Sequence, residues 1–253
     1  ANARGRKTEQ LHNHLGDAWS IQKVKRNQSR VFKFHWKMNN QVKILDLGKM
    51  DYKPSWEFQK NFHKDVLVGK EADTLILVEH EPVFTLGKNA NEDHLLDKSE
   101  SDVKIFNVER GGDITFHGPG QLVGYPILNL NNFKKNISWF MRTLENILIE
   151  CLKSYNIDAH QKKGLTGVWV GEAKIGAQGV KISRWVTMHG FSLNINTDLS
   201  FFNRIVPCGI TDCQVTSMEK LLGAPQNIQD VKLKVVEAFN NNIRLNDSRL
   251  VTA

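Results

Sequence analysis

The sequence of 253 residues is poor in cysteine and has no long apolar run. Its three cysteines are too few, and odd in number, for the dense framework of a disulfide-stabilised secreted domain, which favours a reducing compartment. No stretch approaches the roughly 18–20 apolar residues that span a bilayer, and the first residues lack the apolar core of a secretory signal. We therefore expect a soluble globular protein, whose 40% hydrophobic residues can fill a sizeable core.

Acidic residues are scarce at the start of the sequence. Residues 1–40 hold nine Lys/Arg but two Asp/Glu, whereas the remainder is balanced, so the net charge of +7 belongs to this leading segment. Basic, acid-poor leaders are typical of organelle transit sequences, and a solvated tail or a nucleic-acid arm is the alternative. We interpret residues 1–40 as a basic leader, either a targeting remnant or a disordered segment.

The cysteine spacing leaves several readings open. Cys208 and Cys213 lie five positions apart in "PCGITDC", so they could form a metal clip or a disulfide, or include a nucleophile. Structural zinc needs four clustered ligands, and no histidine stands nearby. The sequence thus predicts no metal site. P-loop and Rossmann glycine patterns are also absent, so nucleotide binding has no motif to support it.

From about residue 42, β-rich runs bounded by Gly and Pro alternate with helical patterns. This order predicts one α+β domain, with a mixed β-sheet core and helices segregated against it, rather than a repeating βαβ fold. Strands are expected at 42–48, 73–80, 83–87, 103–112, 167–170, 173–182 and 185–196, and helices at 55–69, 136–157 and 228–243.

Two of the predicted helices have a defined apolar face. In the helix over 136–157, Cys151 falls on the apolar face, so a buried, inert thiol is expected there. In the helix over 55–69, the residues expected to share one face are Trp56, Phe58, Phe62 and Val66.

The segment "ERGGDITFHGPGQLVGYP", residues 109–126, interrupts a strand pattern with five glycines and two prolines. The backbone there must bend or approach something closely, as in a binding loop. Arg110, beside two glycines, offers a rigid positive fork suited to carbonyl or phosphate oxygens. A glycine-rich hairpin with Arg110 in a surface ion pair explains the same residues equally well.

This segment closely resembles the signature loop of the lipoyl(octanoyl) transferases. Further family segments follow in family order, "LVEHEPVFTLGK", "AKIGAQGVKISRWVTMHGFSLNIN" and "PCGITDCQVTSM" among them, so the resemblance runs from about Val42 to Leu222. It implies the biotin/lipoate protein ligase fold, with a catalytic domain at 41–224 and a C-terminal helix and tail at 225–253. It also implies an enzyme that moves an octanoyl group from octanoyl-acyl carrier protein to the lysine of a lipoyl domain.

The resemblance also implies roles for individual residues. Cys208 carries the acyl group as a thioester, and Lys174 is its partner, since a nearby ammonium favours the thiolate. By itself, the pattern around Lys174 predicts an outward-facing strand residue, because lysine rarely tolerates full burial. The residues expected to line the acyl pocket are Arg110, Gly111, Gly112, Asp113, Ile114, Thr115, Phe116, His117, Ala177, Gln178, Gly179, Gly190, Phe191 and Ser192.

His117 could relay a proton or brace the loop, and the brace is favoured for both His117 and His189. Cys213 is read as an incidental thiol. No cofactor or metal is expected, and the chain is expected to be a monomer that binds neither nucleic acid nor membrane.

The implied partners are octanoyl-acyl carrier protein as donor, and lipoyl domains of 2-oxoacid dehydrogenase E2 subunits and glycine cleavage H protein as acceptors. Lys181 and Arg184 are candidates for contacting the acidic carrier. The leader together with this family implies the mitochondrion, with the cytoplasm or plastid as alternatives. Three rival functions are an ATP-dependent lipoate or biotin ligase, a catalytically silent acyl-binding protein and a papain-like hydrolase.

Overall fold

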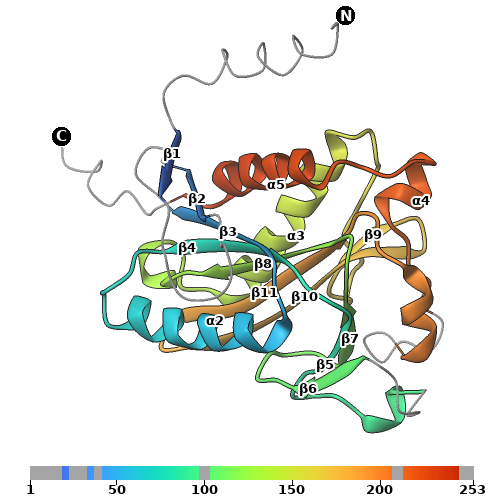
Figure 1. The fold of residues 1–253 in the computed structure, drawn as a ribbon, viewed down its shortest axis with the longest axis horizontal. Coiled ribbons are helices and arrows are strands. Elements are labelled where there is room, and N and C mark those ends of the chain that lie inside the picture. The colour runs from blue at the N-terminus through green and yellow to red at the C-terminus, as the bar shows by residue number, and fades with distance from the viewer. Residues whose placement is uncertain (1–18, 23–32, 37–41, 97–102, 207–212, 245–253) are drawn as a thin grey trace, which may run out of the picture.

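The computed structural model describes residues 19–22, 33–36, 42–96, 103–206 and 213–244. In this part of the chain, an eight-stranded sheet has the order β1-β2-β3-β4-β8-β11-β10-β9, and a three-stranded sheet has the order β6-β5-β7 (Figure 1). The strands are β1 (Trp19–Gln22), β2 (Lys33–Trp36), β3 (Lys43–Lys49), β4 (Thr74–Glu79), β5 (Val83–Leu86), β6 (Lys104–Asn107), β7 (Ile114–His117), β8 (Gln121–Ile127), β9 (Val168–Val170), β10 (Ala173–Ser183) and β11 (Val186–Asn194). The α-helices are α2 (Tyr52–Leu67), α3 (Ile137–Lys153), α4 (Met218–Leu222) and α5 (Ile228–Asn242), and the 3-10 turns are η1 (Glu92–His94), η2 (Leu130–Asn132) and η3 (Leu199–Arg204).

The larger sheet is antiparallel except where β3 pairs with β4. These two strands are parallel because α2 connects them, which makes one βαβ unit. In the smaller sheet, β5 pairs in parallel with β6 and antiparallel with β7. The predicted α+β class and mixed sheet are thus confirmed, although the helices are not all on one side.

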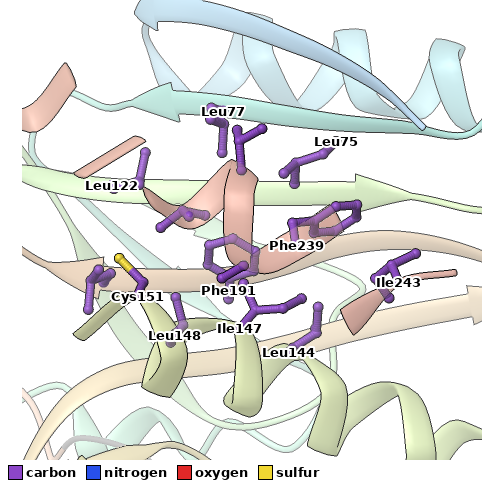
Figure 2. Close-up of a cluster of buried hydrophobic side chains, with 14 of the residues drawn as sticks. Leu75, Leu77, Leu122, Leu144, Ile147, Leu148, Cys151, Phe191, Phe239 and Ile243 are labelled. Carbon is purple, nitrogen blue, oxygen red and sulfur yellow. The ribbon is translucent and has the colours of Figure 1, made fainter. Parts of the chain in front are cut away.

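Helices cover both faces of the larger sheet (Figure 1). Along β4, Leu75 and Leu77 face the cluster that contains α3 and α5, while Ile76 and Val78 face the cluster on the α2 side. This period-two alternation is what a strand buried on both faces requires. Figure 2 shows the first cluster, where Leu122 and Phe191 of the sheet meet apolar side chains of both helices.

Helix α3 begins where the sequence predicts. The side chain of Asn136 accepts a hydrogen bond of 2.8 Å from the amide of Trp139, which caps the first turn. Its apolar face is buried, and Cys151 on that face is 1% exposed. The prediction of a buried thiol is thus confirmed, and burial raises the pKa of this thiol to about 12.

The buried face of helix α2 matches the prediction only in part. Of the four residues expected on it, Val66 is buried, and Phe58 and Phe62 are half-buried and pack against the same cluster. Trp56 lies far around the helix from them. The buried stripe is instead largely polar: Tyr52, Ser55, Gln59, His63 and Val66. Two of these side chains contact the backbone of β11, because His63 Nε2 lies 3.2 Å from the Val186 oxygen and Gln59 Oε1 accepts from the His189 amide at 3.3 Å.

The C-terminal helix belongs to the main core. Val231, Val235 and Phe239 of α5 are buried in the cluster that includes α3. The Lys232 ammonium also lies 2.9 Å from the Asp46 carboxylate on β3, which ties α5 to the far part of the sheet. The division of the chain at residue 224 stays a prediction. None of the helices in the described ranges is both long and apolar enough to cross a membrane.

Candidate active site

A cavity of about 460 Å³ lies beside β8, β10 and β11, where the glycine-rich loop before β7 approaches the edge of β10. Its walls combine backbone, small residues and a few large side chains. Of the residues predicted from the sequence, those that line it are Arg110, Gly111, Gly112, Asp113, Ile114, Thr115, His117, Lys174, Ala177, Gln178, Gly179, Gly190, Phe191 and Ser192.

Phe116 is the predicted pocket residue that does not line the cavity. Its ring is 1% exposed and stacks on Phe201 at 4.5 Å between centroids, in a separate aromatic cluster with Phe84 and Phe202. On β7, Thr115 and His117 reach the cavity while Phe116 between them faces this cluster, as alternation along a strand requires.

Several wall residues escaped sequence reasoning because they come from distant segments. Tyr52 begins α2, Met141 lies on α3, and Leu165 lies in the loop before β9. No local motif marks them. The wall residues missed are Tyr52, Val123, Tyr125, Met141, Gly164, Leu165, Thr166 and Val180, and His189 also lines the cavity.

The loop packs tightly against β10 at a glycine. The Gly111 amide donates a 2.9 Å hydrogen bond to the Val180 oxygen, so the loop continues the sheet edge for one residue. At the neighbouring Gly179, an added Cβ would lie 2.8 Å from the Gly111 oxygen and 3.1 Å from Arg110 Cδ. Glycine at 179 is therefore what permits this close approach.

Arg110 is 8% exposed, which rules out the surface ion pair considered from the sequence. Its guanidinium donates to the Thr85 oxygen at 2.6 Å and to Thr85 Oγ1 at 2.9 Å, and it donates to the Gly111 oxygen at 3.1 Å. The guanidinium does bind oxygen atoms, as expected, but these belong to Thr85 of β5 and to Gly111 of the glycine-rich loop. Arg110 thus fixes the loop as well as lining the cavity.

Lys174 is 5% exposed, so the outward-facing position predicted from the strand pattern is wrong. Its side chain passes over Gly167, where an added Cβ would lie 2.3 Å from Lys174 Cε. The ammonium lies 5.3 Å from the centroid of the Trp169 ring. Lys174 can therefore be buried because Gly167 has no side chain in its path and the ring of Trp169 lies beside its ammonium.

The backbone of Lys174 holds the segment that follows the P-C-G motif. Its amide donates to the Gln214 oxygen at 2.8 Å, and its oxygen accepts from the Thr216 amide at 2.9 Å. Cys208 itself lies outside the described residues, six positions before Gln214. Cys213 is described, and its thiol lies 3.8 Å from the Gln214 oxygen.

His117 belongs to a buried polar network at the cavity. Its Nδ1 lies 2.7 Å from Gln121 Oε1, and its ring stacks on Tyr52 with centroids 6.2 Å apart. Burial, and then the nearby His80 ring, lower the pKa of His117 to about 3. Since His117 is neutral at pH 7 and its Nδ1–H donates to Gln121, these contacts favour a brace over a proton relay.

His189 occupies an unusual backbone position, with φ of 60°, and is 2% exposed. Its Nε2 lies 3.4 Å from Glu109 Oε2, a long contact, while Trp56 Nε1 donates to the same oxygen at 3.0 Å. The interaction with His189 is the largest of the effects that lower the pKa of Glu109 to about 2. Burial lowers the pKa of His189, which favours the neutral ring.

Within the described ranges, no group of three or more His, Cys, Asp or Glu side chains could hold a metal ion. The site instead combines the buried ammonium of Lys174, a glycine-rich backbone segment and a partly apolar cavity. Such a site can hold an acyl chain and stabilise an anion at one end of it.

Comparison with known proteins agrees with this geometry. Residues 51–240 match the family model for the lipoyl protein ligase A/B catalytic domain. The chain is 41% identical over 203 residues to an octanoyltransferase of Syntrophotalea carbinolica, covering 80% of this chain and 95% of that protein. It is 49% identical over 200 residues to an octanoyltransferase of Solibacter usitatus, covering 78% and 90%.

Solved structures with the same fold include a lipoate-protein ligase A bound with ATP, with a TM-score of 0.68 and 14% identity. The match covers 81% of this chain and 85% of that one. A putative lipoate protein ligase from T. acidophilum gives a TM-score of 0.63 at 13% identity, with coverage of 81% and 85%. At such identities the likeness concerns the fold alone, and it confirms the predicted lipoate ligase fold.

Proposed function

The chain belongs to the lipoyl protein ligase A/B catalytic domain family, and we propose that it is an octanoyltransferase of protein lipoylation. It moves an octanoyl group from octanoyl-acyl carrier protein, through a thioester on Cys208, to the lysine of a lipoyl domain. The observation that carries the proposal is the position of Lys174. Its ammonium is buried at the wall of an acyl-sized cavity, and its backbone pairs with the segment that follows Cys208.

The proposed reaction has two acyl exchanges. The Cys208 thiolate attacks the donor thioester, the carbon–sulfur bond to pantetheine breaks, and the pantetheine sulfur leaves as a thiol with the proton that Cys208 gave up. The neutral amine of the acceptor lysine then attacks the enzyme thioester, and the bond to Cys208 breaks so that its sulfur leaves as a thiolate. The proton that the amine loses as the amide forms passes to solvent. Backbone amides near Cys208 and in the 177–179 segment are expected to hold the oxyanion.

Lys174 is proposed to keep the Cys208 thiol ionised. A free cysteine with a pKa of about 8.5 is mostly protonated at pH 7, and a partly desolvated ammonium favours the thiolate. We expect Lys174→Met to shift the pH midpoint of Cys208 alkylation by iodoacetamide upward by about one unit or more. An unchanged midpoint would contradict this role.

The cavity supports an eight-carbon substrate. Val123, Met141, Leu165 and Phe191 supply apolar wall, and small residues leave the space open. Burial of the chain beyond the carbonyl contributes about 5 kcal/mol at roughly 0.8 kcal/mol per methylene. Octanoyl selectivity is therefore attributed to the cavity rather than to polar recognition.

The nearest rival is an ATP-dependent ligase, because one structural neighbour is a lipoate-protein ligase bound with ATP. The test is transfer from octanoyl-acyl carrier protein to a lipoyl domain in the absence of nucleotide, followed by mass spectrometry of the lipoyl domain. We expect one octanoyl group to be added by the wild type and none by Cys208→Ser. A requirement for ATP would favour a ligase, octanoate as sole product a hydrolase, and absence of any product a binding protein.

The partners are also proposed. E2 subunits and H protein are the expected acceptors, and an acidic carrier is the expected donor. Lys181 lines a second groove with Lys60 and Lys64. These three ammonium groups outnumber the carboxylates of Glu57 and Glu109 in the same groove and are proposed to meet the acidic carrier. Arg184 lies in the turn between β10 and β11, and we propose that it adds to the surface that contacts the carrier. The chain is proposed to act as a monomer with no cofactor or metal.

The cellular compartment is proposed from the leader. The basic composition of residues 1–40 favours the mitochondrion, with the cytoplasm or plastid as alternatives, although β1 and β2 within this segment extend the larger sheet beside β3. The matched relatives are mostly bacterial. A fusion of residues 1–40 to a fluorescent reporter tests this directly, since import into mitochondria is the expected result and diffuse fluorescence the contrary one.

A further inference from the structure

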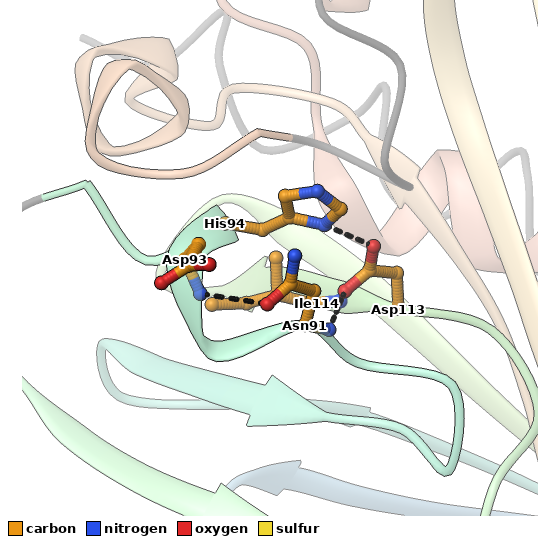
Figure 3. Close-up of polar contacts among 5 residues, drawn as sticks. All are labelled: Asn91, Asp93, His94, Asp113 and Ile114. Carbon is orange, nitrogen blue, oxygen red and sulfur yellow. Dashed lines mark hydrogen bonds and ion pairs between the residues drawn. The ribbon is translucent and has the colours of Figure 1, made fainter.

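The 3-10 turn η1 lies between two segments that the proposed reaction uses. On one side, His94 Nδ1 pairs with Asp113 Oδ2, in the loop that lines the cavity (Figure 3). The other Asp113 oxygen accepts from the Ile114 amide at 2.7 Å and from the Asn91 amide at 3.3 Å. The carboxylate therefore joins η1 to the start of β7.

On its other side, η1 pairs with the residues that lead to the P-C-G motif. The His94 oxygen accepts from the Val206 amide at 2.8 Å, and the Leu96 amide donates to the Arg204 oxygen at 2.9 Å. Leu95 and Ile205 form an antiparallel bridge between these two bonds. His94 thus contacts the cavity loop with its side chain and the approach to Cys208 with its backbone.

The turn itself does not require the His94 side chain. The Asn91 side chain caps η1 by accepting from the Asp93 amide at 3.1 Å, a local bond that satisfies the first turn (Figure 3). The imidazole of His94 instead reaches away from the turn to Asp113, 19 residues further along the chain. Its contact is long-range in sequence and joins separate elements.

We propose that His94 is a positioning residue for acyl transfer, an inference that rests on the proposed function. By holding Asp113 and Val206 to one rigid turn, His94 fixes the loop that cradles the acyl chain relative to the backbone two residues before Cys208. Val206 precedes Cys208 by two positions, so the chain keeps the two Cα atoms within about 7 Å of each other. Misplacement of a reacting group by about 1 Å can slow a reaction roughly 100-fold.

The experiment compares three substitutions at His94 with a matched change on the same turn. His94→Ala removes the bond to Asp113, and His94→Asn keeps a nitrogen donor near the position of imidazole Nδ1. His94→Gln moves that donor away, and Asp93→Ala alters an exposed neighbour on the same turn. The measurement is the single-turnover rate of octanoyl-thioester formation at saturating donor, by intact mass, together with the melting temperature.

The expected result is a 10- to 100-fold slower rate for His94→Ala at an apparent donor affinity within about threefold of wild type. His94→Asn recovers most of the rate, His94→Gln recovers less, and Asp93→Ala matches the wild type. The rate of the double variant His94→Ala/Asp113→Ala is no lower than that of the slower single variant, because both substitutions remove the same His94–Asp113 contact.

Three results would overturn the inference while leaving the proposed function intact: a wild-type rate in His94→Ala, equal rates in His94→Asn and His94→Gln, or multiplicative losses in the double variant. If His94→Ala does not fold, the comparison of the Asn and Gln variants still decides. A wild-type protein that forms no thioester refutes the proposed function, and with it this inference.

Discussion

Substitution of Gly179 by alanine tests how the loop and the sheet form the cavity. The new Cβ would lie 2.8 Å from the Gly111 oxygen, a backbone atom that cannot rotate away. Ordinary contact begins near 3.4 Å, so the loop or the strand must move by roughly 0.6 Å. The Gly111–Val180 hydrogen bond of 2.9 Å resists that movement, because it fixes the loop to the same strand.

We expect Gly179→Ala to cost about 2 kcal/mol of stability, within the range for overpacking. For a chain of this size that lowers the melting temperature by roughly 4–8 °C. Since the displaced loop lines the cavity, octanoyl transfer should fall about tenfold or more. Calorimetry and ATP-free transfer to a lipoyl domain measure the two effects.

Gly111→Ala is the matched control, because it adds the same methyl group to the opposite partner of this contact. Its Cβ would meet one atom within 4 Å, the Val180 oxygen at 3.6 Å, which is ordinary contact. We expect a melting temperature within about 2 °C of wild type. If the two variants lower the melting temperature equally, the close approach of the loop to Gly179 does not explain the need for glycine at this position.

Three further predictions follow from buried groups. Phe116→Leu should lower stability by about 1 kcal/mol and leave acyl-chain preference unchanged, because the ring lies in the aromatic cluster; a changed chain-length profile would contradict this. Cys151→Ala should cost about 1–2 kcal/mol by denaturant titration and leave thioester formation intact, whereas a lost adduct would make Cys151 the nucleophile. Burial lowers the pKa of His80 to about 4, below the unfolded value of about 6.5, so its stabilising contribution is complete above pH 6.5 and is lost progressively toward pH 4. His80→Gln should therefore show a shallower loss of melting temperature between pH 6.5 and 4, and an unchanged slope would refute that origin.

Local patterns predicted the elements well where one period dominated. Helix α3 follows its apolar spacing, and six of the seven expected strands lie close to their predicted bounds. The run at 103–112 is a strand only over Lys104–Asn107, and β7 and β8 were not predicted because the glycines and prolines in and around them interrupt the strand pattern. The buried face of α2 was only partly predicted because its buried residues Ser55, Gln59 and His63 are polar, and Gln59 and His63 contact the backbone of β11. A pattern of apolar residues cannot reveal a face that is buried through polar contacts.

The site was only partly accessible from sequence. Glycines and Arg110 marked the loop, because special backbone geometry leaves a compositional signal. The burial of Lys174 has no such signal in the sequence, because it depends on how the fold places Gly167 and Trp169 around the side chain. His94 likewise stands in a short polar turn without a motif, and its significance depends on which strands that turn joins.

The most direct test of the central claim is intact-mass analysis of the protein after mixing with octanoyl-acyl carrier protein, without nucleotide, followed by mapping of the modified peptide. The account predicts one octanoyl group on the wild type, located on Cys208, absent from Cys208→Ser and still present in Cys213→Ser. An adduct on another residue, or transfer that persists in Cys208→Ser, would contradict it.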